Sequence, residues 1–128
     1  MRFLLDSHTF LWWIVDNGRL SPKVFEIISD GSSELFLSAA SGWELAIKAR
    51  LGKLTLPDDP VPFISQQIKT NNFQELPISI AHALHTYTLP NYHRDPFDRI
   101  LIAQSQMEQL PILTIDRQIS RYAVETIW

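Results

Sequence analysis

Three short apolar runs, each followed closely by a helical stretch, constrain the fold of this chain more than any other feature. The runs are residues 3–5, 35–37 and 111–115. The first and the last end at a carboxylate, Asp6 and Asp116 respectively. Because strand-like runs alternate with helical patterns and no tight hairpin signal occurs, the chain is predicted to form a parallel sheet covered by helices on both faces.

Capping signals indicate where the helices begin. Ser21 stands directly before Pro22, which suits an N-cap followed by the first helical residue, and this helix should end near Asp30. Ser41 and Glu44 have the spacing of a capping box and open a helix that reaches about residue 51. Further helices are expected over 60–70, after Ser79 and over 95–109, with short strands at 73–76 and 125–128.

Composition and charge limit the class of protein. The 128 residues are 45% hydrophobic, which predicts a single globular domain over 1–128. There are 14 acidic against 11 basic residues, so a purely electrostatic nucleic-acid binder is not expected. No cysteine is present, so any metal must be held by oxygen or imidazole ligands, and a cytoplasmic location is expected. No membrane span is expected, because the longest apolar stretch is only Phe10 to Val15.

Four carboxylates stand at or near predicted strand-to-helix junctions. They are Asp6, Glu44, Asp98 and Asp116. The carboxyl ends of parallel strands lie along one edge of a sheet, so these side chains can converge although they are far apart in sequence. Clustered carboxylates raise one another's pKa values unless a cation lies among them. Hard oxygen ligands suit Mg²⁺ or Mn²⁺, which activate water and stabilise phosphoryl-transfer transition states.

Each carboxylate also has a purely structural interpretation. Asp6 and Asp116 are good helix N-caps, and Glu44 fits the capping box or an ion pair with Lys48 one turn later. Asp95 precedes Pro96 and suits an N-cap by the same reasoning. From the pattern alone, the metal-site and structural interpretations stand about equal.

Four segments of the chain, taken together, resemble the PIN-domain proteins, and most of all the VapC-type toxins of bacterial toxin–antitoxin pairs. They are FLLDSHT at 3–9, SAASGWELAIK at 38–48, RDPFDRILIAQ at 94–104 and LTID at 113–116. Residues 51–54, LGKL, and residues 89–90, LP, extend the resemblance, which covers essentially the whole chain.

The resemblance implies a three-layer α/β/α sandwich with a central, mainly parallel sheet, and a metal-dependent endoribonuclease that uses Mg²⁺ or Mn²⁺. The acidic quartet of the family carries over onto Asp6, Glu44, Asp98 and Asp116 as catalytic, metal-binding residues. Asp98 matches the third acid because it directly precedes the Arg-Ile-Leu-Ile-Ala stretch, with Asp95 as its rival.

Further residues and partners follow from the same resemblance. Thr114 matches the polar residue before the last acid and can orient a carboxylate. Independently of the resemblance, Arg94 and Arg99 flank Asp98 and can contact substrate phosphate, with charge balancing the safer interpretation for Arg99. The substrate is expected to be RNA. A small VapB-type antitoxin should act as inhibitor, and the chain is expected to form a homodimer.

Other classes of protein fit less well. A receiver-like signalling domain needs an acidic pair after the first strand, whereas Asp6 is followed by Ser7. A haloacid-dehalogenase-like phosphatase needs an aspartate where His8 stands, and no histidine pair has the spacing of a zinc hydrolase. A catalytically silent nucleic-acid or protein-binding module on the same fold stays open.

Overall fold

The structure is a computed structural model that describes residues 1–128. Its strands are β1 (Arg2–Leu5), β2 (Glu34–Ser38), β3 (Gln74–Leu76), β4 (Ile112–Leu113) and β5 (Thr126–Ile127). Its helices are α1 (Ser7–Val15), α2 (Pro22–Ser29), α3 (Ala39–Arg50), α4 (Pro60–Thr70), α5 (Ile80–His85) and α6 (Pro96–Glu108). Single 3-10 turns occupy Asn17–Arg19, Thr86–Thr88 and Ile119–Arg121.

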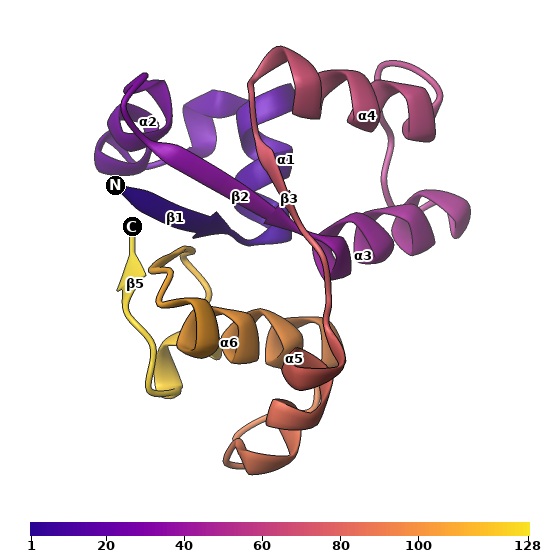
Figure 1. The fold of residues 1–128 in the computed structure, drawn as a ribbon. Coiled ribbons are helices and arrows are strands. Elements are labelled where there is room, and N and C mark those ends of the chain that lie inside the picture. Colours follow the sequence, from indigo (N-terminus) through magenta and orange to yellow (C-terminus); the bar gives the residue numbers. More distant parts are fainter.

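The strands form one parallel sheet in the order β3-β2-β1-β4-β5. β1 lies at the centre, where Leu5 pairs with Leu37 of β2 on one side and with Leu113 of β4 on the other. The chain builds the sheet outward from β1 through β2 and β3, and then returns to add β4 and β5 on the opposite side (Figure 1). The predicted parallel sheet is confirmed.

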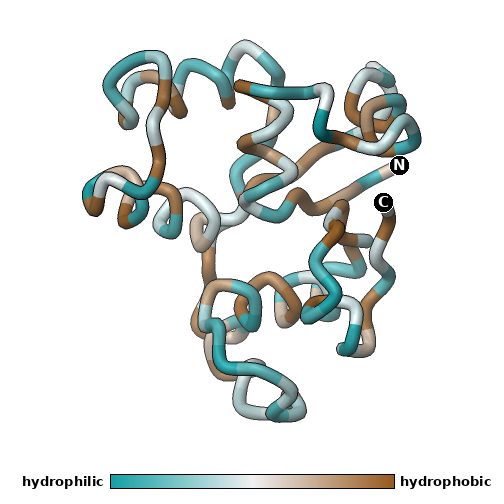
Figure 2. Tube along the Cα trace, turned by 180° about the vertical axis from the view of Figure 1, so that it is seen from behind, coloured by the Kyte–Doolittle hydropathy of each residue, from teal (hydrophilic) through white to brown (hydrophobic).

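Helices cover both faces of this sheet, which makes three layers. Phe3 and Leu5 of β1 pack into a core with residues of α1, α2 and α3, and Ile64 and Ile68 of α4 lie against it. Leu4 points the other way, because successive side chains of a strand alternate between faces, and it packs with Leu101 and Ile102 of α6. Figure 2 shows hydrophobic residues along the strands beside the N-terminus and hydrophilic residues around the outer turns. The expected α/β/α sandwich is therefore confirmed. None of the helices has the length and hydrophobicity that a membrane span requires.

Side chains at the ends of two strands cap the helices that follow, and one of these helices, α3, begins earlier than the sequence patterns predict. α1 starts at Ser7, directly after β1, because an Asp6 carboxylate oxygen accepts a hydrogen bond from the backbone N–H of Thr9 at 2.7 Å and caps the helix. α3 starts at Ala39, where the hydroxyl of Ser38 accepts from the Ala40 N–H at 3.0 Å. The Ser41–Glu44 capping box is therefore wrong, and Glu44 lies in the second turn of α3 instead of the first.

Candidate active site

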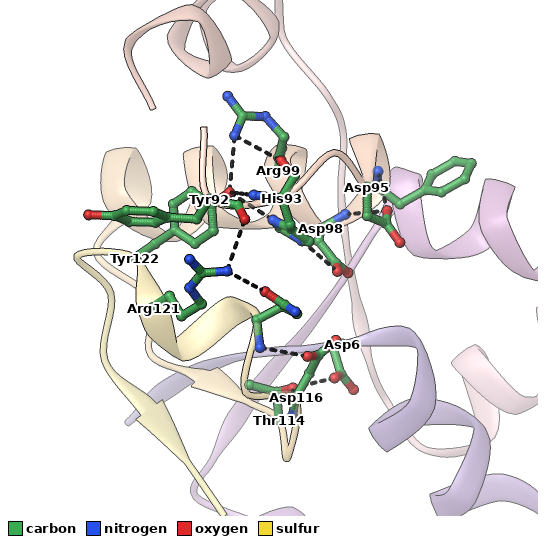
Figure 3. A network of polar contacts seen from close by, with 12 residues as sticks. Asp6, Tyr92, His93, Asp95, Asp98, Arg99, Thr114, Asp116, Arg121 and Tyr122 are labelled. Carbon is green, nitrogen blue, oxygen red and sulfur yellow. Dashed lines mark hydrogen bonds and ion pairs between the residues drawn. The ribbon is translucent and has the colours of Figure 1, made fainter. Parts of the chain in front are cut away.

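The candidate site lies where the order of the sheet reverses, between β1 and β4. In open α/β sheets, ligands bind outside the carboxyl ends of the strands at such a switch point. Asp6 directly follows β1, and Thr114 directly follows β4. The two side chains meet there, since the Thr114 hydroxyl donates a short hydrogen bond to Oδ2 of Asp6 (Figure 3).

Asp6 is a buried carboxylate with both oxygens engaged. Its Oδ1 accepts from the Thr9 N–H and its Oδ2 accepts from Thr114, while only 4% of the residue is exposed. Burial raises the pKa of Asp6, because loss of water disfavours the charged form, and the two threonines and the nearby His8 oppose this rise. The N-cap interpretation of Asp6 is thus confirmed, and a buried acid at a switch point is at the same time a candidate ligand.

Glu44 reaches the same edge of the sheet from α3. It is buried, and the Ser7 hydroxyl donates to its Oε1 at 2.9 Å. Nζ of Lys48 lies 2.8 Å from its Oε2, which is the i,i+4 ion pair considered from the sequence. Since Ser7 follows Asp6 directly, Glu44 is connected to the centre of the site through one side chain.

Asp98 and Asp95 divide two roles at the start of α6. Oδ1 of Asp95 accepts hydrogen bonds from the backbone N–H groups of Phe97 and Asp98, so Asp95 is the N-cap. Figure 3 shows the Asp98 carboxylate turned toward the end of the sheet that carries Asp6 and Asp116. Burial raises the pKa of Asp98 to about 6, with Asp95 and Asp116 adding to the rise and His93 opposing it. The arrangement favours Asp98 over Asp95 as the reactive acid.

His93 is the site residue that the sequence interpretation missed. Its Nε2 lies 3.0 Å from Oδ2 of Asp98, and its Nδ1 lies 2.7 Å from the hydroxyl of Tyr122. An isolated histidine in a loop gives no spacing signal, so only its position five residues before Asp98 could have drawn attention to it.

Arg99 connects α6 to the loop that precedes it and to Tyr122. Its guanidinium donates to the Pro90 carbonyl at 2.8 Å, to the Thr86 carbonyl at 3.1 Å and to the Tyr122 hydroxyl at 3.0 Å. It forms no ion pair with Asp98. Backbone carbonyls of the preceding loop thus engage its donors, and the charge-balancing and substrate roles of Arg99 stay predictions. Arg94 is exposed, and its contact with substrate stays a prediction.

Asp116 lies two residues beyond Thr114 and is held by backbone contacts. Its N–H donates to the Thr114 hydroxyl oxygen at 3.0 Å, and its Oδ1 accepts from the Gln118 N–H at 2.8 Å. The Thr114 hydroxyl therefore joins Asp6 to Asp116, as expected for a residue that orients carboxylates. Asp116 is partly exposed, so it faces the solvent side of the site.

The four acids gather at one edge of the sheet, but each is engaged by a protein partner. No group of three or more aspartate, glutamate or histidine side chains is close enough to hold one metal ion. The donor set nevertheless fits a hard divalent cation, since it consists of carboxylate oxygens alone. The raised pKa values of Asp6 and Asp98 arise first from burial, which disfavours the charged carboxylates in the absence of a cation. The four-acid metal site is thus compatible with the chemistry of these residues and stays a prediction.

Comparison with known proteins identifies the family. The sequence matches the PIN domain over residues 3–125. It is 30% identical to ribonuclease VapC22 of Mycobacterium tuberculosis over 119 residues, which cover 91% of this chain and 88% of VapC22. A stretch of 59 residues, 46% of this chain and 42% of its relative, is 36% identical to ribonuclease VapC16 of the same organism. The chain therefore belongs to the PIN domain family and is of the VapC type, as the sequence motifs predict.

Solved structures share the fold. VapBC2 from Rickettsia felis, solved bound to a DNA fragment from its promoter, superimposes with a TM-score of 0.74 over 100% of this chain and 99% of its own, at 10% identity. FitAcB from Neisseria gonorrhoeae gives a TM-score of 0.63 over 100% and 97% of the two chains, at 19% identity. The receiver-like alternative is excluded, because receivers have the strand order 2-1-3-4-5.

Proposed function

We propose that this protein is a metal-dependent endoribonuclease toxin that a small VapB-type antitoxin inhibits. The observation that carries the proposal is the row of acids at the switch point. Asp6 connects to Glu44 through Ser7 and to Asp116 through Thr114, and Asp98 faces them from α6. The similarity to two proteins named ribonucleases supports the RNA substrate.

Asp6, Glu44 and Asp98 would hold one or two Mg²⁺ or Mn²⁺ ions, directly or through water, and Asp116 would complete the site. A bound ion of this kind lowers the pKa of water and offsets charge on the non-bridging oxygens of the scissile phosphodiester. Metal binding by Asp98 requires a pH above its pKa of about 6, because the carboxylate must lose its proton before it can act as a ligand.

The surrounding side chains of this chain orient the acids. Thr114 fixes Oδ2 of Asp6, and the N-cap bond to Thr9 fixes Oδ1. His93 holds Oδ2 of Asp98, which leaves the other oxygen of that carboxylate free of protein hydrogen bonds. Lys48 pairs with Oε2 of Glu44 and must share that oxygen, or release it, when a cation enters the site.

The partner interactions are proposed from the relatives. The solved VapBC2 structure matches the whole of this chain in fold, and its name joins a VapC-type protein to a VapB-type one. We therefore expect a VapB-type antitoxin as inhibitor. The family resemblance, and not this structure, leads us to expect a homodimer of this chain and action in the cytoplasm.

Cleavage of a mixed RNA pool by the purified protein tests the activity. We expect fragments in the presence of Mg²⁺ or Mn²⁺, no fragments after addition of EDTA, and recovery when Mn²⁺ is restored in excess. Cleavage that persists in EDTA and is absent from an Asp6→Asn preparation purified in the same way would contradict the metal-dependent mechanism.

A catalytically silent binding module is the second candidate. The engagement of Asp6, Glu44 and Asp98 by protein partners favours it, because each contact also serves the fold. Trp43 packs edge-to-face against Phe97, next to Asp98, with ring centroids 5.2 Å apart. A change in tryptophan fluorescence with millimolar Mg²⁺ is therefore expected of the nuclease, and no change is expected of the silent module.

A further inference from the structure

A small basic pocket adjoins the acidic row on the side of Glu44. It has a volume of about 200 Å³, and its polar lining consists of Ser7, His8, Lys48 and Lys53. Ser7 and Lys48 are also the two residues that contact the Glu44 carboxylate. The pocket and the candidate active site therefore share a wall.

A glycine turn brings the second lysine into this pocket. Gly52 has a φ of +73°, and the chain reverses there so that the Lys53 N–H donates to the Lys48 carbonyl at 2.9 Å. This is the backbone pattern that commonly ends a helix at a left-handed glycine. Because of this turn, Lys53 lies beside Lys48 although α3 has ended. The LGKL segment at 51–54 thus places a second lysine at the pocket.

The charge of the pocket is positive in a chain whose net charge is −3. No aspartate or glutamate lines it. Lys48 is paired with Glu44, whereas the ammonium group of Lys53 has no carboxylate within ion-pair distance. Lys53 is thus an exposed, uncompensated cation beside a row of acids that are proposed to cut a phosphodiester.

We propose that this pocket binds a backbone phosphate of the RNA next to the scissile one, with Lys53 as its main contact. The inference rests on the proposed ribonuclease function and adds to it the way the substrate is held. The acidic row repels the RNA backbone, whereas Lys53 attracts the neighbouring phosphate. This contact positions and orients the RNA strand across the site.

The size and the walls of the pocket fit this ligand. Pockets that enclose whole small molecules have volumes of roughly 300–1,000 Å³, so this one suits a single charged group with the adjoining sugar. Leu11, Leu45 and Leu54 form its apolar side and can contact the carbon face of a ribose. The nearby His8 provides an aromatic ring at the rim, where it packs against Trp12 with centroids 5.9 Å apart.

Binding of a fluorescein-labelled single-stranded RNA of about twelve nucleotides tests the proposal. All proteins carry Asp6→Asn so that the RNA stays intact, and Mg²⁺ is present throughout. Loss of one lysine–phosphate contact with a single strand lowers the slope of log K against log salt by about 0.7. Lys53→Gln should therefore show this smaller slope and about fivefold weaker binding near 0.1 M salt. Lys53→Arg should bind like the parent, since it keeps the charge.

Lys23→Gln is the matched control. Lys23 is an exposed lysine of α2 that lines a hollow with Met1 and Phe3. This hollow lies at the amino ends of the strands, away from the four acids of the candidate active site. Lys23→Gln should bind RNA within twofold of the parent, with an unchanged slope. If Lys53→Gln binds RNA as Lys23→Gln does, the phosphate pocket is wrong.

The outcome separates this proposal from the one it rests on. A protein without the Asp6 substitution that cleaves no RNA with Mg²⁺ or Mn²⁺ contradicts the ribonuclease function, whatever Lys53 does. Cleavage by that protein, with equal binding by the two glutamine variants, overturns the pocket alone. Weaker binding of a glutamate-rich peptide by Lys53→Gln, with unchanged binding of RNA, would instead assign the pocket to an acidic protein segment.

Discussion

The imidazole Nε2 of His93 lies 3.0 Å from Oδ2 of Asp98, and the opposite ring nitrogen lies 2.7 Å from the Tyr122 hydroxyl. The position of the Asp98 carboxylate is thus linked to Tyr122, in the C-terminal part of the chain. Arg99 donates to the same hydroxyl at 3.0 Å and ties the preceding loop to this contact. Asp98 is therefore held in place by a chain of three side chains.

His93→Ala should weaken the response to metal more than it weakens the fold. Loss of a residue that orients a ligand typically costs about 10- to 100-fold in metal affinity or activity. We expect the Mg²⁺ concentration for half-maximal cleavage to rise by at least about tenfold. His85→Ala is the control, because the side chain of His85 hydrogen-bonds Gln106, more than two turns beyond Asp98 along α6. Identical metal dependence in the two variants would show that His93 does not position Asp98.

Asp98→Asn should stabilise the metal-free protein near neutral pH. The folded-state pKa of Asp98, about 6, lies above its ordinary value of 3.8, so protonation of this group favours folding. Its contribution is present below about pH 4 and is lost as the pH rises through 6. Asparagine carries no charge to bury, so thermal melts at pH 7.5 in EDTA should give a Tm about 3 °C higher than the parent's, for roughly 1 kcal/mol after allowance for solvent screening.

The difference between Asp98→Asn and its parent should shrink toward pH 4, where the parent carries the proton. A variant that is less stable than the parent at pH 7.5, or whose advantage does not depend on pH, would contradict the unfavourable burial of this carboxylate.

Divalent metal should stabilise the folded protein in a pH-dependent manner. A ligand at 100 times its Kd adds about 2.7 kcal/mol to the free energy of unfolding. Because protons compete for Asp98, the rise in Tm with Mn²⁺ should be larger at pH 7.5 than at pH 5. Asp6→Asn should lose most of the rise. An equal rise in Asp6→Asn would place the metal elsewhere on the molecule.

Thr114→Val should destabilise the fold as well as the site. The substitution keeps the shape of the side chain but leaves Oδ2 of the buried Asp6 without its donor and the Asp116 N–H without its acceptor. A buried polar group without a partner costs about 1–3 kcal/mol, which urea unfolding can measure. Thr114→Ser retains the hydroxyl and should recover most of the loss. Equal free energies of unfolding for the valine variant and the parent would mean that the Thr114 hydroxyl does not stabilise the fold.

Much of this site follows from local sequence. An apolar run that stops at a carboxylate, as at Asp6, identifies both the end of a strand and a candidate ligand, since strands buried on both faces are near-continuous hydrophobic runs. Asp116 follows the same reasoning, although β4 ends at Leu113 and not at Ile115 as predicted, whereas Thr114 is assigned through the family resemblance. The parallel sheet is also predictable, because each pair of parallel strands needs a long crossover connection, and the helices between the short strands provide it.

Other features depend on contacts that no local pattern contains. α3 begins at Ala39 and not near Ser41, because Ser38 at the end of β2 caps it and leaves the Ser41 hydroxyl buried without a partner. The role of Arg99 depends on carbonyls that a loop brings back over α6. His93 meets Tyr122 across 29 residues of sequence. Tertiary packing determines the start of α3, the contacts of Arg99 and the contact of His93 with Tyr122. The periodicity of a single sequence does not contain this information.

Single-turnover cleavage of one RNA at pH 7.5 with Mg²⁺ tests the central claim most directly, when the parent, Asp6→Asn and Asp16→Asn are compared side by side. Asp16 is an exposed aspartate at the end of α1 that forms no side-chain hydrogen bond and no ion pair, so its variant carries the same charge change outside the site. Removal of a group central to metal-assisted hydrolysis lowers the rate by several orders of magnitude, so Asp6→Asn should retain less than about 1% of the parental rate. Asp16→Asn should retain all of it. Cleavage by Asp6→Asn at the parental rate would contradict the proposed active site.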